Sequence, residues 1–261
     1  MPRYVAKIQY DGTRYVGYQV QPNGPTIQAA IERALKTMAK LPKGQHIPTS
    51  GSSRTDSGVH ALGQVIHFDY PANIQPESLL RAMNSLLDPS IRFIQVVRVS
   101  DEFHSRYHSV GKHYLYRVDT QRFPDPFKRQ YTLHHPYRYN LSDMQEAIEK
   151  IIGTHDFSSF CSTKTDKEDK VRTIYHANVE FDEQSQELRF AFHGNGFLYN
   201  MIRILVGTLL QIGDGLKPVS EMERLLRVKD RNEGRPTASP EGLYLAKVLY
   251  AEDPFETAEN E

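Results

Sequence analysis

The chain has 261 residues, of which 39% are hydrophobic, enough for one large or two ordinary domains with a buried core. Thirty-two basic residues balance thirty-two acidic ones, so the total charge does not indicate a nucleic-acid partner. Any such partner therefore needs a local basic patch, for which the candidates are residues 122–130, 164–172 and 227–235. Each segment mixes both signs of charge, and a solvated loop is the simpler interpretation of each one taken alone.

The composition also excludes several classes of protein. The single cysteine, Cys161, permits neither an internal disulfide nor a cysteine-based metal site. The longest apolar stretch, Met201–Gly213, is too short to span a membrane and contains Arg203, and the first residues lack the apolar core of a signal peptide. We therefore expect a soluble, cytoplasmic protein that does not contact a membrane.

The N-terminal half predicts six elements in the order β-α-β-β-α-β. Alternating apolar residues predict strands, whereas apolar residues three or four apart predict helices, the first with Thr26 as its N-cap. Residues 11–25 form a polar loop. The predicted elements are a strand over 4–10, a helix over 27–38, a short strand over 47–50, a strand over 64–70, a helix over 76–87 and a strand over 91–99.

The C-terminal half repeats this order of elements without repeating the residues. Its predicted elements are strand 112–119, helix 141–152, strands 173–182 and 187–194, helix 197–212, a short helix 221–228 and strand 243–250. Two split β-α-β (ferredoxin-like) halves predict an α+β fold with a continuous, mainly antiparallel sheet, helices on one face and a central cleft. We expect an N-terminal domain over 1–105, a C-terminal domain over 106–250 and a disordered acidic tail over 251–261.

The stretch SSRTDSGVH, residues 52–60, places Asp56 in a turn just before a strand. Asp56 and Gly58 are typical turn residues, because aspartate bonds locally and glycine accepts a positive φ. Arg54 lies two residues earlier, so in an extended chain both side chains point to one face, where the guanidinium could keep the carboxylate ionised. From these residues alone, a turn without chemistry is the simpler interpretation.

Three other chemistries are not supported by the spacing of their residues. The serines around Asp56 lack the G-x-S-x-G spacing of a hydrolase, since residue 55 is threonine. Residues 109–113 lack the first glycine and the last hydroxyl of a phosphate-binding loop. His104 and His108 lead into a strand and have no accompanying ligand set, so we assign no metal.

Two features of the C-terminal half bear on a binding site. Tyr114 and Tyr116 share one face of their strand, where they could stack on unpaired bases for roughly 1–3 kcal/mol each, although core packing is the commoner role. In the helix over 197–212 the core stripe is formed by Met201, Leu205 and Leu209. Arg203 interrupts this apolar helix, and it either reaches outward or is paired with an acid, for which Asp56 is a candidate.

Taken together, these stretches resemble the TruA family of tRNA pseudouridine synthases. Residues 10–35 are similar to its N-terminal signature, residues 52–68 to its catalytic Arg-Thr-Asp segment, and residues 103–118 to the segment bearing its active-site tyrosine. In the C-terminal half the similar segments are 153–160, 171–174, 195–210 and 240–245, so the resemblance runs in order through residues 4–250. This chain departs from the commonest pattern at Tyr18, where the family usually has tryptophan, and at Ser53 and Ser57.

The resemblance implies isomerisation of uridine to pseudouridine at positions 38–40 of the tRNA anticodon stem-loop, by a homodimer without metal or cofactor. Asp56 resembles the essential aspartate, Tyr114 the tyrosine that stacks on the target base, and Arg203 the basic partner of the aspartate. Leu243 resembles an apolar wall of the site. Arg54 matches the arginine of the signature, which implies a role in base flipping or in contacting phosphate.

Such chemistry suits these residue types. A carboxylate can attack the ribose C1′ or the base C6, or remove a proton from C2′, and the sequence does not choose among these routes. Nor does it decide whether Tyr114 transfers a proton or only stacks. Two alternatives from other classes remain: a non-catalytic RNA-binding or RNA-chaperone module, and a histidine-dependent metallohydrolase.

Overall fold

The computed structural model describes residues 1–165, 168–234 and 236–256, which form two compact units. Unit 1 consists of residues 1–110 and of the described residues from Tyr244 onward, and unit 2 consists of Gly111–Leu243. The first division lies close to the predicted domain boundary. The last strand, however, is grouped with the N-terminal half, whereas the sequence placed residues 106–250 together.

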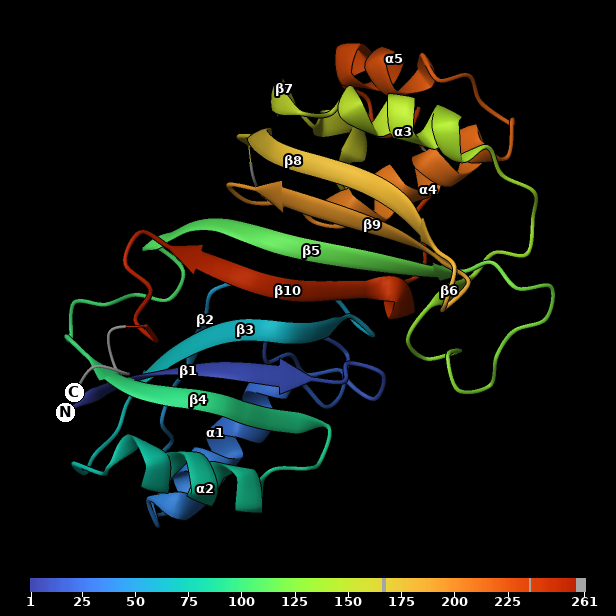
Figure 1. Cartoon of the computed structure of the whole chain (residues 1–261). Helices are drawn as coiled ribbons and strands as arrows, with labels where there is room; N and C mark the ends of the chain where they lie inside the picture. The colour runs from blue at the N-terminus through green and yellow to red at the C-terminus, as the bar shows by residue number, and fades with distance from the viewer. Residues whose placement is uncertain (166–167, 235, 257–261) are drawn as a thin grey trace. The chain divides into compact units, whose positions relative to one another are not determined.

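Unit 1 is a mainly antiparallel sheet with two helices (Figure 1). Its elements are β1 (Arg3–Tyr10), α1 (Ile27–Met38), β2 (Ser50–Gly51), β3 (His60–Asp69), α2 (Pro76–Leu86), β4 (Ile91–Val99) and β10 (Leu243–Tyr250). The strand order is β4-β1-β3-β10, with β2 paired to β3. β1 runs antiparallel to both of its neighbours, and β10 runs parallel to β3.

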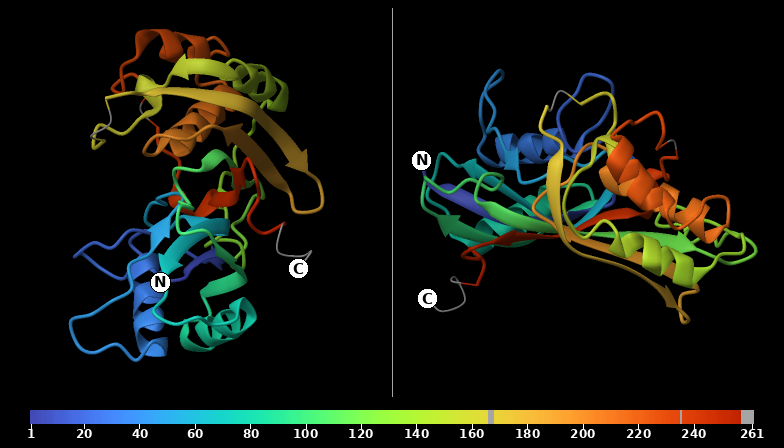
Figure 2. Two further views of the ribbon diagram at one scale, coloured as in Figure 1. Left: turned by 90° about the vertical axis from the view of Figure 1, so that its left-hand side faces the viewer. Right: turned by 90° about the horizontal axis from the view of Figure 1, so that it is seen from above.

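The two helices of unit 1 pack against each other on one side of this sheet, as Figures 1 and 2 show. The predicted N-cap of α1 is confirmed, because the Thr26 hydroxyl accepts a hydrogen bond from Ala29 N at 3.3 Å. The helix buries Ile27, Ile31 and Leu35 at the predicted spacing. Proline at the first position of α2 suits its start, since that amide has no partner inside the helix.

Unit 2 repeats the α+β arrangement. Its elements are β5 (Ser109–Asp119), β6 (Leu133–His134), α3 (Leu141–Glu149), β7 (Gly153–Asp156), η1 (Ser158–Phe160), β8 (Val171–Asp182), β9 (Glu187–Gly194), α4 (Met201–Gly213), α5 (Glu221–Val228) and η2 (Pro240–Gly242). The strand order is β5-β9-β8-β7, all antiparallel, and β6 pairs with β5 in parallel. The predicted α+β class with mainly antiparallel strands is confirmed.

The core of unit 2 lies between its strands and α4. The predicted stripe is confirmed, since Met201, Leu205 and Leu209 are fully buried. α3 packs against both β8 and α4, and α5 packs against α3 and α4. These contacts place α4, which carries Arg203, at the centre of the unit.

Several predicted boundaries are wrong for local reasons. The helix expected from residue 197 begins at Met201, because Asn200 has a φ of 60° that no α-helix contains. The short strands β6 and β7 were not predicted, since two and four residues are too few to show a period. The tail also differs from expectation, because Phe255 is buried and its carbonyl accepts a hydrogen bond from Gln95 Nε2 at 3.2 Å. Residues 257–261 of that tail lie outside the described part of the chain.

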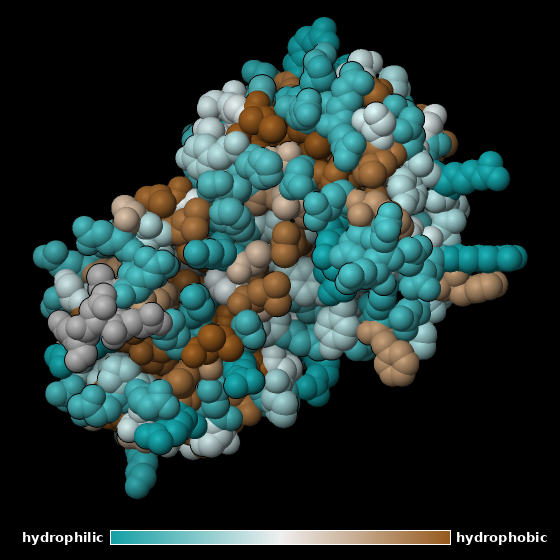
Figure 3. All heavy atoms as spheres, viewed as in Figure 1, coloured by the Kyte–Doolittle hydropathy of each residue, from teal (hydrophilic) through white to brown (hydrophobic). Residues whose placement is uncertain are grey.

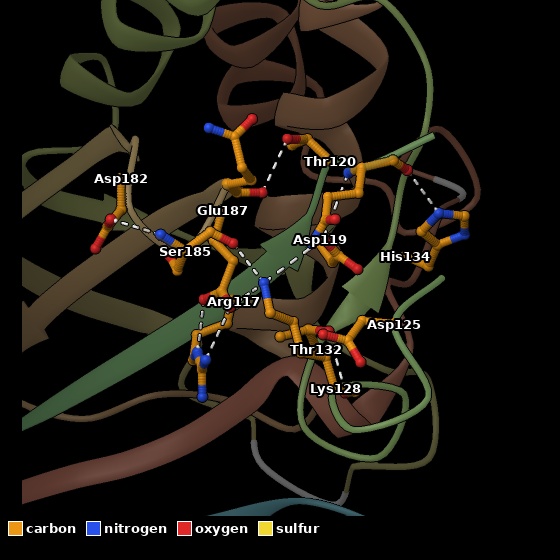
Figure 4. Close-up of polar contacts among 12 residues, drawn as sticks. Arg117, Asp119, Thr120, Asp125, Lys128, Thr132, His134, Asp182, Ser185 and Glu187 are labelled. Carbon is orange, nitrogen blue, oxygen red and sulfur yellow. Dashed lines mark hydrogen bonds and ion pairs between the residues drawn. The ribbon is translucent and has the colours of Figure 1, made fainter. Parts of the chain in front are cut away.

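Two acidic side chains are buried side by side where β5 and β9 meet at one end (Figure 4). Asp119 and Glu187 are register partners and are 1% and 0% exposed. Arg117 binds Glu187 with two hydrogen bonds of 2.8 and 2.9 Å. Lys128 reaches in from the loop after β5, with Nζ 3.2 Å from Glu187 Oε1 and 3.8 Å from Asp119 Oδ1. These cations fix the end of β5 and the loop that follows it.

The surface seen in Figure 3 is mostly hydrophilic, with patches of hydrophobic residues between. The most exposed aromatic side chains among the described residues are Phe127, Tyr107 and Phe123, at 87%, 76% and 71%. Within residues 1–165, 168–234 and 236–256, none of the helices has the length and hydrophobicity needed to span a lipid bilayer.

The carboxylate pair makes a prediction about stability. Lys128→Met should lower the free energy of unfolding at pH 7 by about 3 kcal/mol, because it removes the cation that the two buried carboxylates share. Urea denaturation measures this, with exposed Arg122→Met from the same loop as the control, expected within about 0.5 kcal/mol of wild type. Equal free energies of unfolding for Lys128→Met and Arg122→Met would contradict the stabilising role of Lys128.

The same pair predicts a pH dependence. Burial alone would raise the pKa of Glu187, but the hydrogen bonds and charges of Arg117 and Lys128 lower it by more, so it stays below its usual value. A lowered carboxyl pKa stabilises the fold above the unfolded value of about 4.3, and this contribution is lost as the pH falls through the folded value. The difference in the free energy of unfolding between wild type and Lys128→Met should therefore become smaller below about pH 4.3 in the same denaturation experiment.

Candidate active site

Asp56 occupies the first position of a turn in unit 1, as the sequence predicted. Val59 N donates to Asp56 O at 3.1 Å, and Gly58 has a φ of 76°, the left-handed conformation that favours glycine. The Asp56 side chain is half-buried and that of Arg54 is exposed. The turn thus presents an acid and a nearby cation at the surface of unit 1.

A buried glutamine fixes the segment before Asp56 to β3. Gln64 is completely buried, and its Oε1 accepts from the Ser52 hydroxyl at 2.7 Å. Its Nε2 donates to Ser53 O at 2.7 Å. The sequence analysis missed this residue, although a glutamine in an otherwise apolar strand was a signal, because a buried amide must find partners.

Two tyrosines fix the same segment from the other side. The Tyr10 hydroxyl lies 2.8 Å from Thr55 Oγ1, and Tyr18 N donates to Thr55 O at 3.0 Å. The Tyr10 and Tyr18 rings lie 6.3 Å apart, and both are buried. Tyr18, where the family usually has tryptophan, thus retains an aromatic ring under the turn.

The loop between β1 and α1 lies directly along the Asp56 turn. Gly17 forms an isolated antiparallel bridge with Asp56, and Gly58 N donates to Tyr15 O at 3.3 Å. Gly17 has a φ of 124°, and a Cβ there would lie 3.0 Å from Thr55 O. A Cβ on Gly12 would lie 2.0 Å from Val59 O. The sequence analysis described this loop only as polar, yet its glycines allow the close approach that braces the turn.

Tyr114 and Leu243, two of the predicted site residues, belong to unit 2. Tyr114 lies on β5, is 6% exposed, and meets the Phe197 ring edge-on at 5.1 Å. Leu243, also 6% exposed, follows η2, where a Cβ on Gly242 would lie 2.6 Å from Arg117 O. The approach of Gly242 to β5 therefore sets the position of Leu243.

Arg203 braces the segment that leads to Leu243. Its Nε donates to Ala238 O at 2.7 Å, and Ala238 N donates to Arg203 O at 2.9 Å. Its Nη1 donates to Asn200 Oδ1 at 3.0 Å. The Tyr116 hydroxyl donates to Ser239 O at 2.6 Å, and burial of the ring raises its pKa above the usual value. Tyr116 thus serves the core, while Asp56 belongs to unit 1 and its pairing with Arg203 stays a prediction.

Residues tied to the alternative chemistries have local structural contacts. His104 N donates to His108 Nδ1 at 3.4 Å, and the His104 ring lies 4.6 Å from that of His67. Burial lowers the pKa of His67 to about 4, and the neighbouring His104 adds to this effect. Cys161 is buried, as expected of a small packing residue. Within the described residues, no group of three or more histidine, cysteine or acidic side chains could hold a metal ion.

The brace along the Asp56 turn can be tested with matched glycine variants. Gly17→Ala and Gly44→Ala both place alanine at a positive φ, which costs roughly 1–2 kcal/mol, but nothing lies within 4 Å of the Gly44 position. Only Gly17→Ala should displace Thr55 and slow the reaction implied by the resemblance, by about 10- to 100-fold in kcat. Steady-state kinetics beside thermal melting separates the two effects. Equal kcat in Gly17→Ala and Gly44→Ala would contradict the proposed role of Gly17 in holding the Asp56 turn.

The sequence of this chain is similar to those of known proteins. The family model described as tRNA pseudouridine synthase matches residues 6–108 and 147–251. A tRNA pseudouridine synthase A of Latilactobacillus sakei subsp. sakei (strain 23K) is 50% identical over 248 residues, covering 95% of this chain and 98% of the relative. One of Lacticaseibacillus casei (strain BL23) is 50% identical over 250 residues, covering 96% of this chain and 100% of the relative.

Among solved structures, a chain of a Cbf5-Nop10-Gar1 complex aligns with a TM-score of 0.35 and 14% identity, over 79% of this chain and 45% of that one. The sequence matches, in contrast, span both units: the family match includes the segments that hold Asp56 and Arg203, and the first relative covers 95% of the chain. The resemblance inferred from the sequence is therefore confirmed. This chain belongs to the tRNA pseudouridine synthase family, isomerases that convert uridine to pseudouridine in tRNA.

Proposed function

We propose that this protein converts uridine to pseudouridine at positions 38, 39 and 40 of the tRNA anticodon stem-loop, with Asp56 as the essential carboxylate. The observation that carries the proposal is the bracing of the Asp56 turn, which Gln64 and Tyr10 hold from either side. Preorganised geometry of this kind is what a reacting carboxylate requires.

Asp56 acts by one of three routes: attack on C1′, attack on C6 or removal of the C2′ proton. In each route the carboxylate must be ionised when it meets the substrate, so it needs a cation that offsets the loss of water. We assign this task to Arg203. Its backbone brace at Ala238 supports the assignment, because a guanidinium held at its Nε has a fixed direction.

The target uridine must leave the helical stack before it can react. Extrusion costs a few kcal/mol and is offset by stacking and by phosphate contacts. We assign stacking to Tyr114, whose ring is held edge-on by Phe197, and base flipping or phosphate contact to the exposed Arg54. Leu243 forms an apolar wall for the base.

We further propose that the protein acts in the cytoplasm as a homodimer, without metal or cofactor. The isomerisation supports the proposed absence of a metal or cofactor, because it moves a base on its own ribose and has no net oxidation, reduction or hydrolysis. The reaction needs a carboxylate, a cation and a proton acceptor, all of which side chains supply.

Asp56→Asn tests the central residue. The amide has nearly the shape of the acid but cannot act as nucleophile or base, so pseudouridine formation should fall to background while the Kd for tRNA stays within about threefold of wild type. Tritium release from tRNA labelled at uridine C5 measures turnover, and filter binding measures Kd. Asp101→Asn, an exposed acid of unit 1, is the matched control and should retain full activity. Turnover by Asp56→Asn would favour a non-catalytic role for this residue. Absence of turnover in both wild type and variant would favour an RNA-binding or chaperone function.

The role of the Tyr114 hydroxyl can be separated from that of its ring. Tyr114→Phe keeps the ring and its contact with Phe197, so tRNA binding should be unchanged. Tritium release should slow by at least about tenfold, because the C5 proton loses its candidate acceptor. Tyr114→Ala should lose turnover and also weaken binding. Release at the wild-type rate from Tyr114→Phe would restrict the residue to stacking.

A further inference from the structure

A polar pocket of about 380 Å³ lies in unit 2 beside the start of α4. Two amides, one guanidinium and three hydroxyls line it: Ser162, Thr163, Asn200, Arg231, Asn232 and Thr237. None of these six residues is acidic. Nothing in the proposed roles of Asp56, Tyr114, Arg54 and Leu243 uses this pocket.

Two lining residues use an acceptor oxygen in the hydrogen bonds that hold them. Asn200 Oδ1 accepts from Arg203 Nη1 at 3.0 Å, so the donor end of this amide, Nδ2, points away from the guanidinium. Thr237 Oγ1 accepts from Arg231 Nη2 at 2.9 Å, which leaves the proton of the hydroxyl to donate. A lining rich in donors, with one fixed cation, suits an anion with several acceptor oxygens.

Two cations lie near Cys161, the neighbour in sequence of the lining residue Ser162. Burial raises the pKa of the Cys161 thiol, next to Ser162, and the nearby cations Lys170 and Arg172 oppose that rise. The two acids closest in sequence to Arg231 each have a partner, one of them at the pocket-lining residue Asn232. Asp230 Oδ1 accepts from Asn232 N at 2.9 Å, and Glu233 binds Arg224 at 3.1 Å. The electrostatic field therefore favours an anion at the pocket.

The pocket is linked to the proposed site through one amide. Asn200 contributes to its wall and also holds Arg203, the proposed cation partner of Asp56. An anion bound by Asn200 would thus fix the same amide that orients the guanidinium. We propose that this pocket binds a backbone phosphate of the tRNA substrate, with Arg231 supplying the charge and Asn200 coupling the bound phosphate to Arg203. The proposal rests on the proposed function, since it takes tRNA as the substrate.

The salt dependence of tRNA binding tests the charge contributed by Arg231. Each phosphate contact adds about 0.7–0.9 to the slope of log K against log salt concentration. Arg231→Ala should therefore reduce the slope by about that amount and weaken binding at low salt, as measured by filter binding at four salt concentrations. Arg227→Ala is the matched control, because Arg227 is an exposed arginine of α5 that does not line the pocket. Equal slopes in the two variants would overturn the proposal.

A second variant guards against loss of the fold. Thr237 is exposed, so Thr237→Val should fold normally and should weaken tRNA binding by about threefold to tenfold, with the salt slope unchanged. Wild-type affinity in Thr237→Val would count against the pocket even if Arg231→Ala were unstable. If inorganic phosphate binds the pocket but the salt slope of tRNA binding does not depend on Arg231, the assignment of the pocket to an RNA phosphate is overturned.

The pocket and the proposed function can fail separately. Pseudouridine formation by a protein whose salt slope does not depend on Arg231 would overturn the pocket alone. If the salt slope depends on Arg231 as predicted but the wild-type protein forms no pseudouridine, the proposed reaction is overturned and the pocket remains a tRNA-binding site. Both readings come from the same preparation, because the binding assay needs no turnover.

Discussion

The close approach of the β1–α1 loop to the Asp56 turn is the constraint on which the site in unit 1 depends. Gly12 and Gly17 let backbone meet backbone where a side chain would clash, and Gly17 pairs directly with Asp56. The turn is then enclosed by β3 on one side, through Gln64, and by the loop on the other. A carboxylate mounted in this way does not depend on a flexible surface loop for its position.

Unit 2 uses a related arrangement around β5. Tyr116 and Gly242 hold the segment before Leu243 against this strand, while Arg203 ties the same segment to α4. At the end of β5, the buried pair of Asp119 and Glu187 gathers two cations and fixes the loop beyond. Tyr114 lies on the same strand, two residues before Tyr116. The residues that support the site therefore need particular side chains, as do the residues proposed to react.

Elements with a clear period could be predicted from the sequence. The N-cap at Thr26, the strand β4 and the stripe of α4 follow from spacing and from capping chemistry, both of which are local. Asp56 and Gly58 marked a turn for the same reason. The start of α4 at Met201 could not be predicted, because the positive φ of Asn200 leaves no mark in the spacing of the apolar residues.

The support around the site was equally hidden from local reasoning. Gln64 acts through a partner 11 residues away in sequence, and Gly12 and Gly17 approach Val59 and Asp56 from much farther along the chain, so only the fold brings these partners together. The net charge gave no information, although two of the three candidate basic segments, 164–172 and 227–235, contain the cations Lys170, Arg172 and Arg231. Resemblance to a family, rather than periodicity, identified Asp56 and Tyr114 as candidates.

The central claim, that this protein forms pseudouridine in the anticodon stem-loop, is tested most directly by mapping pseudouridine in tRNAs from cells with and without it. The account predicts that pseudouridine at positions 38, 39 and 40 disappears in the deleted strain and returns with the wild-type gene, while pseudouridines elsewhere in tRNA are unchanged. Persistence of all three modifications in the deleted strain would contradict it.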